Sequence, residues 1–331
     1  MHIACTSFAA MAARATRSAS RAASSSDDAS RCHLLALSHD ELGVVFDGLA
    51  NPLQPVVAVA LSSTCLGLRT PLLAALEVLQ QRHEKAAALG RKGTMPGSYS
   101  TGEPARVPMT CAELRDAEEL DWNERGLTAD DMATLGLILP WMPSLKKLYL
   151  YINKLGDAGM QALCKGLGRG AALSLRYLVC GGNDFGPAGA EALAAALSRG
   201  AMPILETLEL GDNFIGNQGV AALAPALKKL PALDYLDLGV CGIGDEGVAS
   251  LLDNLGKDDF KVLEKLYLDN NQITDKGCAT LVTALKAGAL PAIEALCYPG
   301  TADESFSDEA SKEACVAVNE ALRQRLHARN A

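Results

Sequence analysis

The hydrophobic positions of this chain follow one pattern that recurs five times between Leu145 and Gly277. Apolar residues with the spacing L-x-x-L-x-L are followed by Asn or Cys, a further apolar residue and Gly, and the copies begin 30, 30, 28 and 30 residues apart. The five copies are Leu145, Leu148, Leu150, Asn153, Leu155, Gly159; Leu175, Leu178, Cys180, Asn183, Phe185, Gly189; Leu205, Leu208, Leu210, Asn213, Ile215, Gly219; Leu233, Leu236, Leu238, Cys241, Ile243, Gly247; and Leu263, Leu266, Leu268, Asn271, Ile273, Gly277.

Each copy predicts a strand, a turn and a helix. The L-x-L core is typical of a short strand with its leucines pointing inward, and the Asn suits a turn because its side chain bonds backbone groups left over at the strand's end. We expect helix N-caps two residues before the Gly; these are Asp157, Asn217, Asp245 and Asp275, whereas one copy has Pro187 there. Beyond the Gly, apolar residues return at helical spacing, as in Met160, Leu163, Cys164 and Leu167 or in Val220, Leu223, Ala224 and Leu227.

This pattern resembles the leucine-rich repeat, and its long repeats with a full helix are similar to the ribonuclease-inhibitor subfamily. The resemblance implies an α/β fold: a right-handed solenoid shaped as a horseshoe, with parallel strands inside and helices outside. It also implies a surface that binds protein, and it implies no chemistry.

The pattern weakens at both ends of the array. Residues 114–140 predict an eroded first repeat in which Arg125 takes the asparagine position, and Ile293 begins an incomplete last one. An amphipathic helix is expected over 307–331, where it would close the solenoid, with Cys315 and Val318 among its apolar residues. We therefore expect about seven repeats over 111–306, because atypical terminal repeats are normal in such arrays.

Three segments precede the repeats. Residues 1–33 are rich in Ala, Ser and Arg and have no acidic residue before Asp27, which is typical of a disordered leader or of an organelle transit peptide. Residues 34–90 predict a small set of helices, with a capping box at 38–41 and a second N-cap at Thr70-Pro71. Residues 91–110 are rich in Gly, Pro, Ser and Thr and predict a linker.

The helical segment resembles an F-box in the order of its residues. The motif L-x-x-D-E-L at 37–42, the apolar residues that follow it and L-S-x-T-C-x-x-L-R at 61–69 all fall where that family has them, although Ser38 replaces the usual Pro and Pro52 and Pro55 interrupt the middle. The resemblance implies that residues 34–80 dock a Skp/cullin ubiquitin-ligase core. The adaptor-docking residues would be Leu37, Leu42, Val45 and Phe46. The alternative is a helical cap on the solenoid.

The residues between the leucines of each strand predict the binding surface. They form three columns along the concave face, and five of the seven tyrosines of the chain lie on them. Tyr combines a large contact area with a polar tip, and carboxylates share the same face, so we expect it to bind a protein segment of basic character. The alternative is that Tyr is simply a good strand residue. The predicted contact residues are Tyr149, Tyr151, Tyr177, Glu209, Tyr235, Asp237, Tyr267 and Asp269.

Composition narrows the function further. A net charge of -9 argues against nucleic-acid binding. No apolar run approaches the ~20 residues of a membrane span. The ten cysteines form no C-x-x-C pair, which favours a reducing compartment, cytoplasmic or nuclear, unless residues 1–33 direct the chain to an organelle. All five histidines lie outside the repeats, so we expect no metal, no cofactor and no catalysis.

Three functions fit this organisation. The first is a non-catalytic adaptor that binds a client on the solenoid and a ubiquitin ligase through the helical segment. The second is a stand-alone binding or inhibitor scaffold of the ribonuclease-inhibitor type. The third, a GTPase activator, has a precedent in the same repeat subfamily but no supporting residue here.

Overall fold

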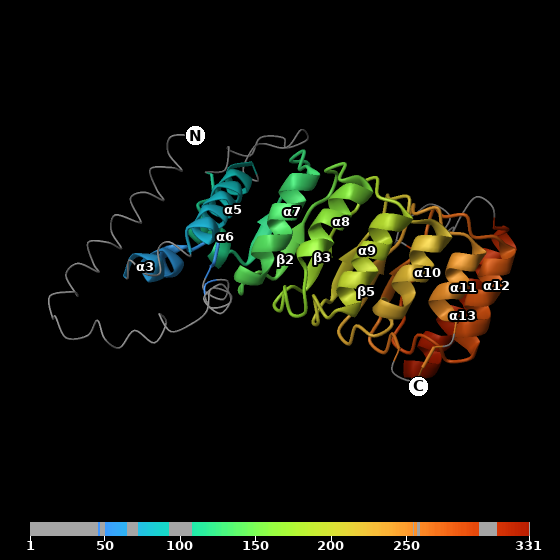
Figure 1. Cartoon of the computed structure of the whole chain (residues 1–331). Coiled ribbons are helices and arrows are strands. Elements are labelled where there is room, and N and C mark those ends of the chain that lie inside the picture. Colours follow the sequence, from blue (N-terminus) through green and yellow to red (C-terminus); the bar gives the residue numbers. More distant parts are fainter. Residues whose placement is uncertain are drawn as a thin grey trace. The chain divides into compact units, whose positions relative to one another are not determined.

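The computed structural model describes residue 46 and residues 50–64, 72–92, 108–253, 255–256, 259–297 and 310–330 (Figure 1). The chain divides into two compact units. The helical unit comprises the described residues up to Asp116, and the repeat unit comprises those from Ala117 onward.

The strands of the repeat unit form one parallel sheet in which spatial order equals chain order. Each strand is three residues long and pairs with the strand of the next repeat. The strands are β1 (Glu119–Asp121), β2 (Lys147–Tyr149), β3 (Tyr177–Val179), β4 (Thr207–Glu209), β5 (Tyr235–Asp237) and β6 (Lys265–Tyr267). An isolated bridge from Lys265 to Ala295 continues this sheet by one residue.

A helix follows every strand, and the helices α7 to α12 stand in a row along the other side of the unit (Figure 1). They are α7 (Ala129–Ile138), followed by the 3-10 turn η3 (Leu139–Trp141), α8 (Gly156–Gly166), α9 (Pro187–Ser198), α10 (Gly216–Leu227), α11 (Asp245–Leu252) and α12 (Asp275–Lys286), with α13 (Lys312–Asn330) packed on α12. The leucine-rich-repeat solenoid expected from the sequence is thus the observed architecture.

The pattern of leucines places the core between the sheet and the helix row. The central leucines of neighbouring strands are paired in register, as in Leu148 with Leu178, and are buried. The apolar positions predicted on the helices are buried as well, Met160 and Val220 among them. The eroded first repeat follows the same plan, because β1 pairs with β2 and Trp122, Leu127 and Met132 are all buried.

The asparagines form a buried ladder at the strand ends. The side-chain amide of Asn183 donates to the carbonyl of Leu150 in the preceding repeat at 2.8 Å and to that of Cys180 in its own at 2.9 Å. Its Oδ1 accepts the backbone N–H of Asn153 at 2.8 Å. One side chain therefore satisfies three backbone groups that the short strands leave without partners. Asn153, Asn213 and Asn271 make equivalent bonds.

Two positions of this ladder depart from asparagine. Cys241 keeps part of the pattern, because its buried Sγ lies 3.3 Å from the carbonyl oxygen of Leu210 and 3.4 Å from that of Gly239. Arg125, in the first repeat, has buried Nε and Nη1 atoms without a hydrogen-bond partner. The ladder is thus least satisfied at its N-terminal end.

The predicted helix N-caps are wrong in a specific way. Asp157, Asn217, Asp245 and Asp275 lie within the first turn of their own helices and are not caps there. Instead, each bonds the helix start of the following repeat. The Oδ1 of Asp157 accepts the N–H groups of Gly186 and Gly189, the N-cap and third residue of α9, at 2.8 and 2.7 Å.

The same cross-repeat bonds occur further along the array. Asn217 accepts the N–H groups of Gly244 and Gly247 at 2.7 and 3.1 Å. Asp245 accepts those of Thr274 and Gly277, both at 2.9 Å, and the Thr274 hydroxyl donates to its other oxygen at 2.7 Å. The repeat glycine is needed here because a Cβ at Gly277 would lie 2.4 Å from the Asp245 carboxylate.

Helices without such a cap begin differently. The residue one repeat upstream of Asp157 is Ala129, and Pro187 stands at the next equivalent position, so neither offers a side-chain acceptor to α8 or α10. These two helices start at Gly156 and Gly216, whose φ angles of 57° and 60° are left-handed and favour glycine. In the capped helices the equivalent residue is extended, with φ of -107° at Gly186 and -94° at Thr274.

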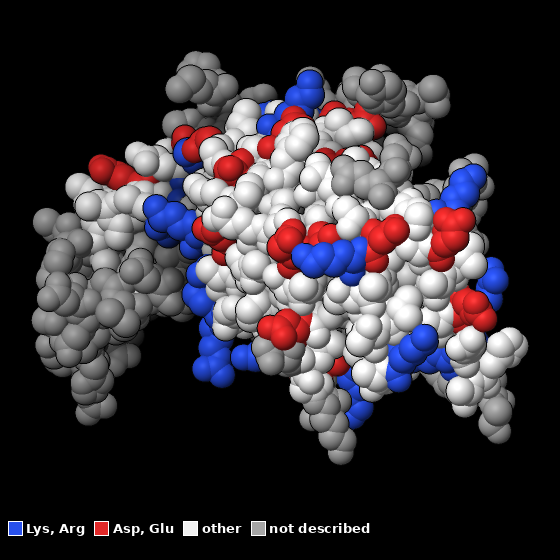
Figure 2. All heavy atoms as spheres, turned by 90° about the vertical axis from the view of Figure 1, so that its right-hand side faces the viewer, with Lys and Arg blue, Asp and Glu red and all other residues white. Residues whose placement is uncertain are grey.

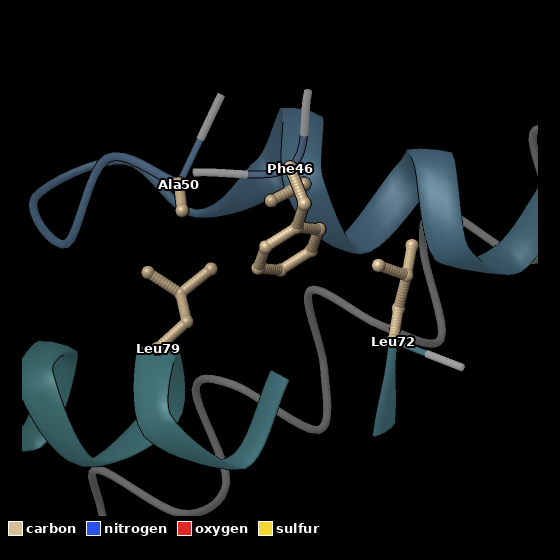
Figure 3. Close-up of a cluster of buried hydrophobic side chains, with 5 residues drawn as sticks. Phe46, Ala50, Leu72 and Leu79 are labelled. Carbon is tan, nitrogen blue, oxygen red and sulfur yellow. The ribbon is translucent and has the colours of Figure 1, made fainter. Parts of the chain in front are cut away.

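The helical unit contains α3 (Val56–Thr64), α5 (Leu73–Lys92) and α6 (Cys111–Asp116). Its core gathers Phe46, Ala50, Leu72 and Leu79, whose side chains point toward one another in Figure 3, together with Ala58. The capping box at 38–41, Thr70-Pro71 and most of the predicted linker lie outside the described residues, and Arg91 and Lys92 still belong to α5. The domain bounds given above stay a prediction.

Asp245 offers a test of the cross-repeat cap. Burial raises its pKa, but the hydrogen bonds from Thr274 and Gly277 outweigh this and leave the pKa below 3.8. Its stabilising contribution is therefore complete above pH 3.8 and is lost as the pH falls through the lower folded-state value. We expect Asp245→Ala to lower the free energy of unfolding at pH 7 by about 1 kcal/mol, as other lost caps do.

The matched variant is Asp245→Asn, because Asn217 makes the same bonds with an amide. Urea unfolding at pH 7 should give nearly wild-type stability for this variant, and between pH 5 and 2 it should lose stability less steeply than wild type. Equal stability of the Ala and Asn variants at pH 7 would show that the cap contributes nothing.

Candidate protein-binding surface

The predicted columns are present in the sheet, and we call their side chains the strand face. Strand pairing aligns the first column from Glu119 to Lys265 and the second from Asp121 to Tyr267, repeat by repeat. The third column holds glycines in three successive repeats, at Gly181, Gly211 and Gly239. This column therefore leaves space into which side chains of neighbouring repeats extend.

Carboxylates fill part of that space. A Cβ on Gly211 would lie 3.0 Å from the carboxylate of Asp237, and one on Gly239 would lie 3.2 Å from Asp237 and 3.3 Å from Asp269. Asp237 also accepts the N–H of Gly239 at 2.8 Å. Because glycine carries no side chain, two acidic residues of adjacent repeats lie close together over the backbone.

Burial and charge repulsion act on the same group. Burial is the main cause that raises the pKa of Asp237 to about 6; the N–H of Gly239 opposes the rise, and the nearby carboxylates of Asp269, Glu209 and Asp212 contribute to it. Burial also raises the pKa of Glu209. We call Glu209, Asp212, Asp237 and Asp269 the acidic group. Glu209, Asp237 and Asp269 are partly or largely buried, Asp212 is exposed, and the charges of the other three members all act on Asp237. Such a concentration of one sign favours a cationic partner.

The tyrosines lie in two sets on the same strand face. The ring of Tyr151 lies over the glycine column, since a Cβ on Gly181 would lie 3.1 Å from it. Burial raises the pKa of the Tyr151 hydroxyl, and the charges of Asp212, Glu124, Asp237 and Glu209 add to that rise. Tyr149 is half-buried two residues earlier on the same side. Further along the sheet, the rings of Tyr235 and Tyr267 pack edge to face with centroids 5.2 Å apart.

Two lysines of the first column lie over tyrosine rings. The Nζ of Lys147 is 5.7 Å from the ring centre of Tyr177, and that of Lys265 is 5.8 Å from the ring centre of Tyr235. Lys147 also pairs with Glu119 at 3.2 Å. These contacts are cation–π interactions. They show that the tyrosines of this face already accept cationic side chains.

The predicted contact residues differ in how much surface they present. Tyr149, Tyr151, Tyr177, Glu209, Tyr235 and Asp237 are half-buried. Tyr267 and Asp269 are only 4% and 9% exposed, so they shape the face more than they offer contact area. The sequence prediction did not include Asp212 among the contact residues, because Asp212 follows the third column and belongs to the turn, where its φ is 57°. It also missed Phe214, which is 70% exposed in the same loop.

The adaptor-docking residues are placed only in part. Leu37, Leu42 and Val45 lie outside the described residues. Phe46 is 1% exposed and packs within the core of the helical unit (Figure 3). Its side chain therefore supports that unit from inside.

Charge on the side of the repeat unit where α12 and α13 lie is mixed. Figure 2 looks from the side on which α12 and α13 lie in Figure 1, and acidic and basic side chains are interspersed there among uncharged ones.

Within the described ranges, no three His, Cys, Asp or Glu side chains are arranged to hold a metal ion. No helix in the described part of the chain combines the length and the hydrophobicity needed to span a bilayer.

Comparison with known proteins identifies the repeats. A leucine-rich repeat family model matches residues 142–164, 172–194, 201–224, 231–252 and 261–282. These segments are therefore leucine-rich repeats, and repeats of this kind generally bind protein partners.

No curated protein sequence matches this chain. Among solved structures, Leiomodin-1 Actin-Binding Site 2 is similar over 65% of this chain and 84% of its own, with 14% sequence identity and a TM-score of 0.28. A likeness of that size carries no argument about function.

The acidic group predicts an unusual titration. The folded-state pKa of Asp237 lies near 6, above the ordinary 3.8, so the folded protein holds this proton more tightly than the unfolded chain does. The stabilisation that comes from the protonated carboxyl is complete below pH 3.8 and is lost as the pH rises through 6. We expect Asp237→Asn to unfold at higher urea concentration than wild type at pH 8, with a gain on the order of 2 kcal/mol that vanishes near pH 4.

A carboxyl-carbon NMR titration of the wild-type protein should place the Asp237 midpoint near pH 6. Asp184→Asn serves as the control, since Asp184 is an exposed acid. A midpoint near 4 for Asp237, with no pH-dependent difference from the Asn variant, would contradict the prediction.

Proposed function

We propose that this protein is a non-catalytic scaffold whose strand face binds a protein segment rich in arginine or lysine. The observation that carries the proposal is the acidic group, in which Asp237 is surrounded by Asp269, Glu209 and Asp212. Folding brings these charges together and buries Asp237, which destabilises its ionised form and raises its pKa. A basic side chain placed among them would remove that cost on binding.

The tyrosines support the same partner chemistry. Lys147 and Lys265 lie over Tyr177 and Tyr235, so these rings are oriented for cations. Tyr149 and Tyr151 are half-buried and give rigid contact area beside the carboxylates. A segment with alternating basic and small residues would meet a carboxylate and a ring in turn as it crosses the repeats.

Peptide binding tests the proposal. Fluorescein-labelled nonapeptides with zero, two or four arginines, and a matched set with glutamates, would be titrated with the full chain and followed by anisotropy. We expect affinity to rise with arginine content, to fall with added salt and to fall below pH 6 as Asp237 gains its proton. The glutamate peptides should not bind.

Variants locate the site. Glu209→Gln with Asp237→Asn, and separately Tyr149→Ala with Tyr235→Ala, should each weaken binding by roughly tenfold or more, which is the scale of an interface hot spot. The control is Glu191→Gln, an exposed acid of α9 on the helix side. Unchanged affinity in both double variants would exclude the strand face as the binding site.

A role as ubiquitin-ligase adaptor is the more specific form of this function. It is supported by the F-box-like order of residues 37–69 and by a helical unit that has its own core. The stand-alone scaffold or inhibitor of the ribonuclease-inhibitor type needs only the strand face. The two differ in whether the helical unit contacts a second protein.

A binding assay with a purified Skp/cullin core separates them. The adaptor proposal expects the full chain to retain the core, and Leu37→Asp with Leu42→Asp to abolish retention while leaving the peptide binding described above unchanged. Phe46 is not a suitable site for the variant, because its side chain is part of the core. Absence of retention by the wild-type chain would leave the stand-alone scaffold.

A further inference from the structure

Helix α13 occupies the place of one more repeat helix. The N–H of Ser311 donates to Oδ1 of Asp275 at 2.6 Å, as the N–H of Thr274 donates to Oδ1 of Asp245 one repeat earlier. The hydroxyl of Ser311 then accepts the N–H of Ala314 at 3.2 Å. The cross-repeat cap is therefore repeated at the junction between α12 and α13.

The other end of α13 is also bonded to α12. Arg325 donates from Nη1 to the carbonyl of Leu285 at 2.9 Å and from Nη2 to that of Gly288 at 3.1 Å. These carbonyls belong to the last turn of α12 and the residues after it. The two helices consequently run in the same direction and in a defined register.

That register brings two cysteines together. Cys278 follows Thr274 by four residues, and Cys315 follows Ser311 by four, so they occupy equivalent positions of adjacent helices. Both are free thiols, 1% and 5% exposed, and their side chains are in hydrogen-bonding contact. The equivalent positions of the earlier repeats hold Met160, Ala190, Val220 and Val248.

We propose that Cys278 and Cys315 are a redox-sensitive pair that forms a disulfide and locks α13 onto α12. Two features favour this pair over the other cysteines of the repeats. It joins two separate helices through thiols that already touch, and it lies at the end of the solenoid. Terminal units of a repeat array open most readily, because they have one neighbour instead of two.

The thiols are protected while α13 is docked. Burial raises the pKa of Cys278 to about 12, and the neighbouring Cys315 thiol adds to that rise, so little thiolate exists at neutral pH. When α13 opens, one cysteine thiolate attacks a small-molecule disulfide such as oxidised glutathione, forming a mixed disulfide and releasing one glutathione thiol. The second cysteine then attacks the protein sulfur of that bond and releases the other glutathione.

The exchange is balanced without any further reactant. Two protein thiols lose two protons and two electrons, and one glutathione disulfide becomes two thiols. The new bond closes a loop between residues 278 and 315. The closed loop lowers the conformational entropy of the unfolded chain and holds α13 in place. Oxidation would therefore convert the last helix from an element that opens locally into a fixed end of the array.

Peptide mapping tests the pairing. The full chain would be incubated with oxidised glutathione, with and without mild urea that lets α13 open, then alkylated and digested with trypsin without reduction. The two cysteines fall in separate peptides with no other cysteine, Gly277–Lys286 and Glu313–Arg323. We expect these peptides to be joined, and dithiothreitol to separate them.

Thermal unfolding tests the lock. Oxidation should raise the Tm of the repeat unit by roughly 5–10 °C, the effect of a typical disulfide in a domain of this size. Cys278→Ala and Cys315→Ala should each abolish this shift, whereas Cys164→Ala, a buried cysteine of α8, should keep it. Comparing each variant with its own reduced form removes any loss caused by the substitution itself.

Two results would overturn the proposal. One is the absence of the joined peptide after oxidation in mild urea. The other is a joined peptide whose formation leaves the Tm unchanged, since the bond would then not restrain α13.

Discussion

Very short strands impose the main physical constraint on this fold. A strand of three residues pairs only part of its backbone with its neighbours, and the polypeptide must leave the sheet within the buried layer. A buried backbone group without a partner costs about 1–3 kcal/mol, so a repeat of this kind needs an internal source of hydrogen bonds. The asparagine ladder supplies it, with one amide serving its own repeat and the one before. Helix packing and the exposed columns both depend on that junction being satisfied.

The cross-repeat caps apply the same solution at the other end of the strand-to-helix loops that precede α9, α11, α12 and α13. A carboxylate or amide in the first turn of one helix accepts the two leading N–H groups of the next. These helix starts are therefore completed by the preceding repeat, and the interfaces between repeats contribute directly to the stability of the array. The helix of the first repeat, α7, instead uses a local capping box between Thr128 and Asp131.

Sequence pattern alone predicted the repeats, their strand register and the role of the asparagines, because a strict period of about 30 residues leaves few alternatives. It did not predict which helix a capping acid serves. An Asp or Asn two positions before the glycine is the same sequence pattern whether its side chain caps its own helix or the helix of the next repeat. Only the stacking of the repeats determines which helix it caps. Burial at Tyr267 and Asp269 was missed for a similar reason, since alternation shows which side a residue faces but not what its neighbours cover. Phe46 illustrates the same limit in the helical unit.

The two kinds of helix start have a consequence for how such an array changes in evolution. Where a repeat carries Ala129 or Pro187 at the capping position, the helix of the next repeat starts at a left-handed glycine. Where it carries Asp157, Asn217 or Asp245, the next helix starts after an extended residue. Repeats are consequently not interchangeable modules, although they share a consensus. A duplication or deletion preserves the match only when the new neighbours pair an acceptor with an extended start or a non-acceptor with a glycine start. We therefore expect changes in repeat number to preserve the fold best in blocks that keep both partners of such a pair.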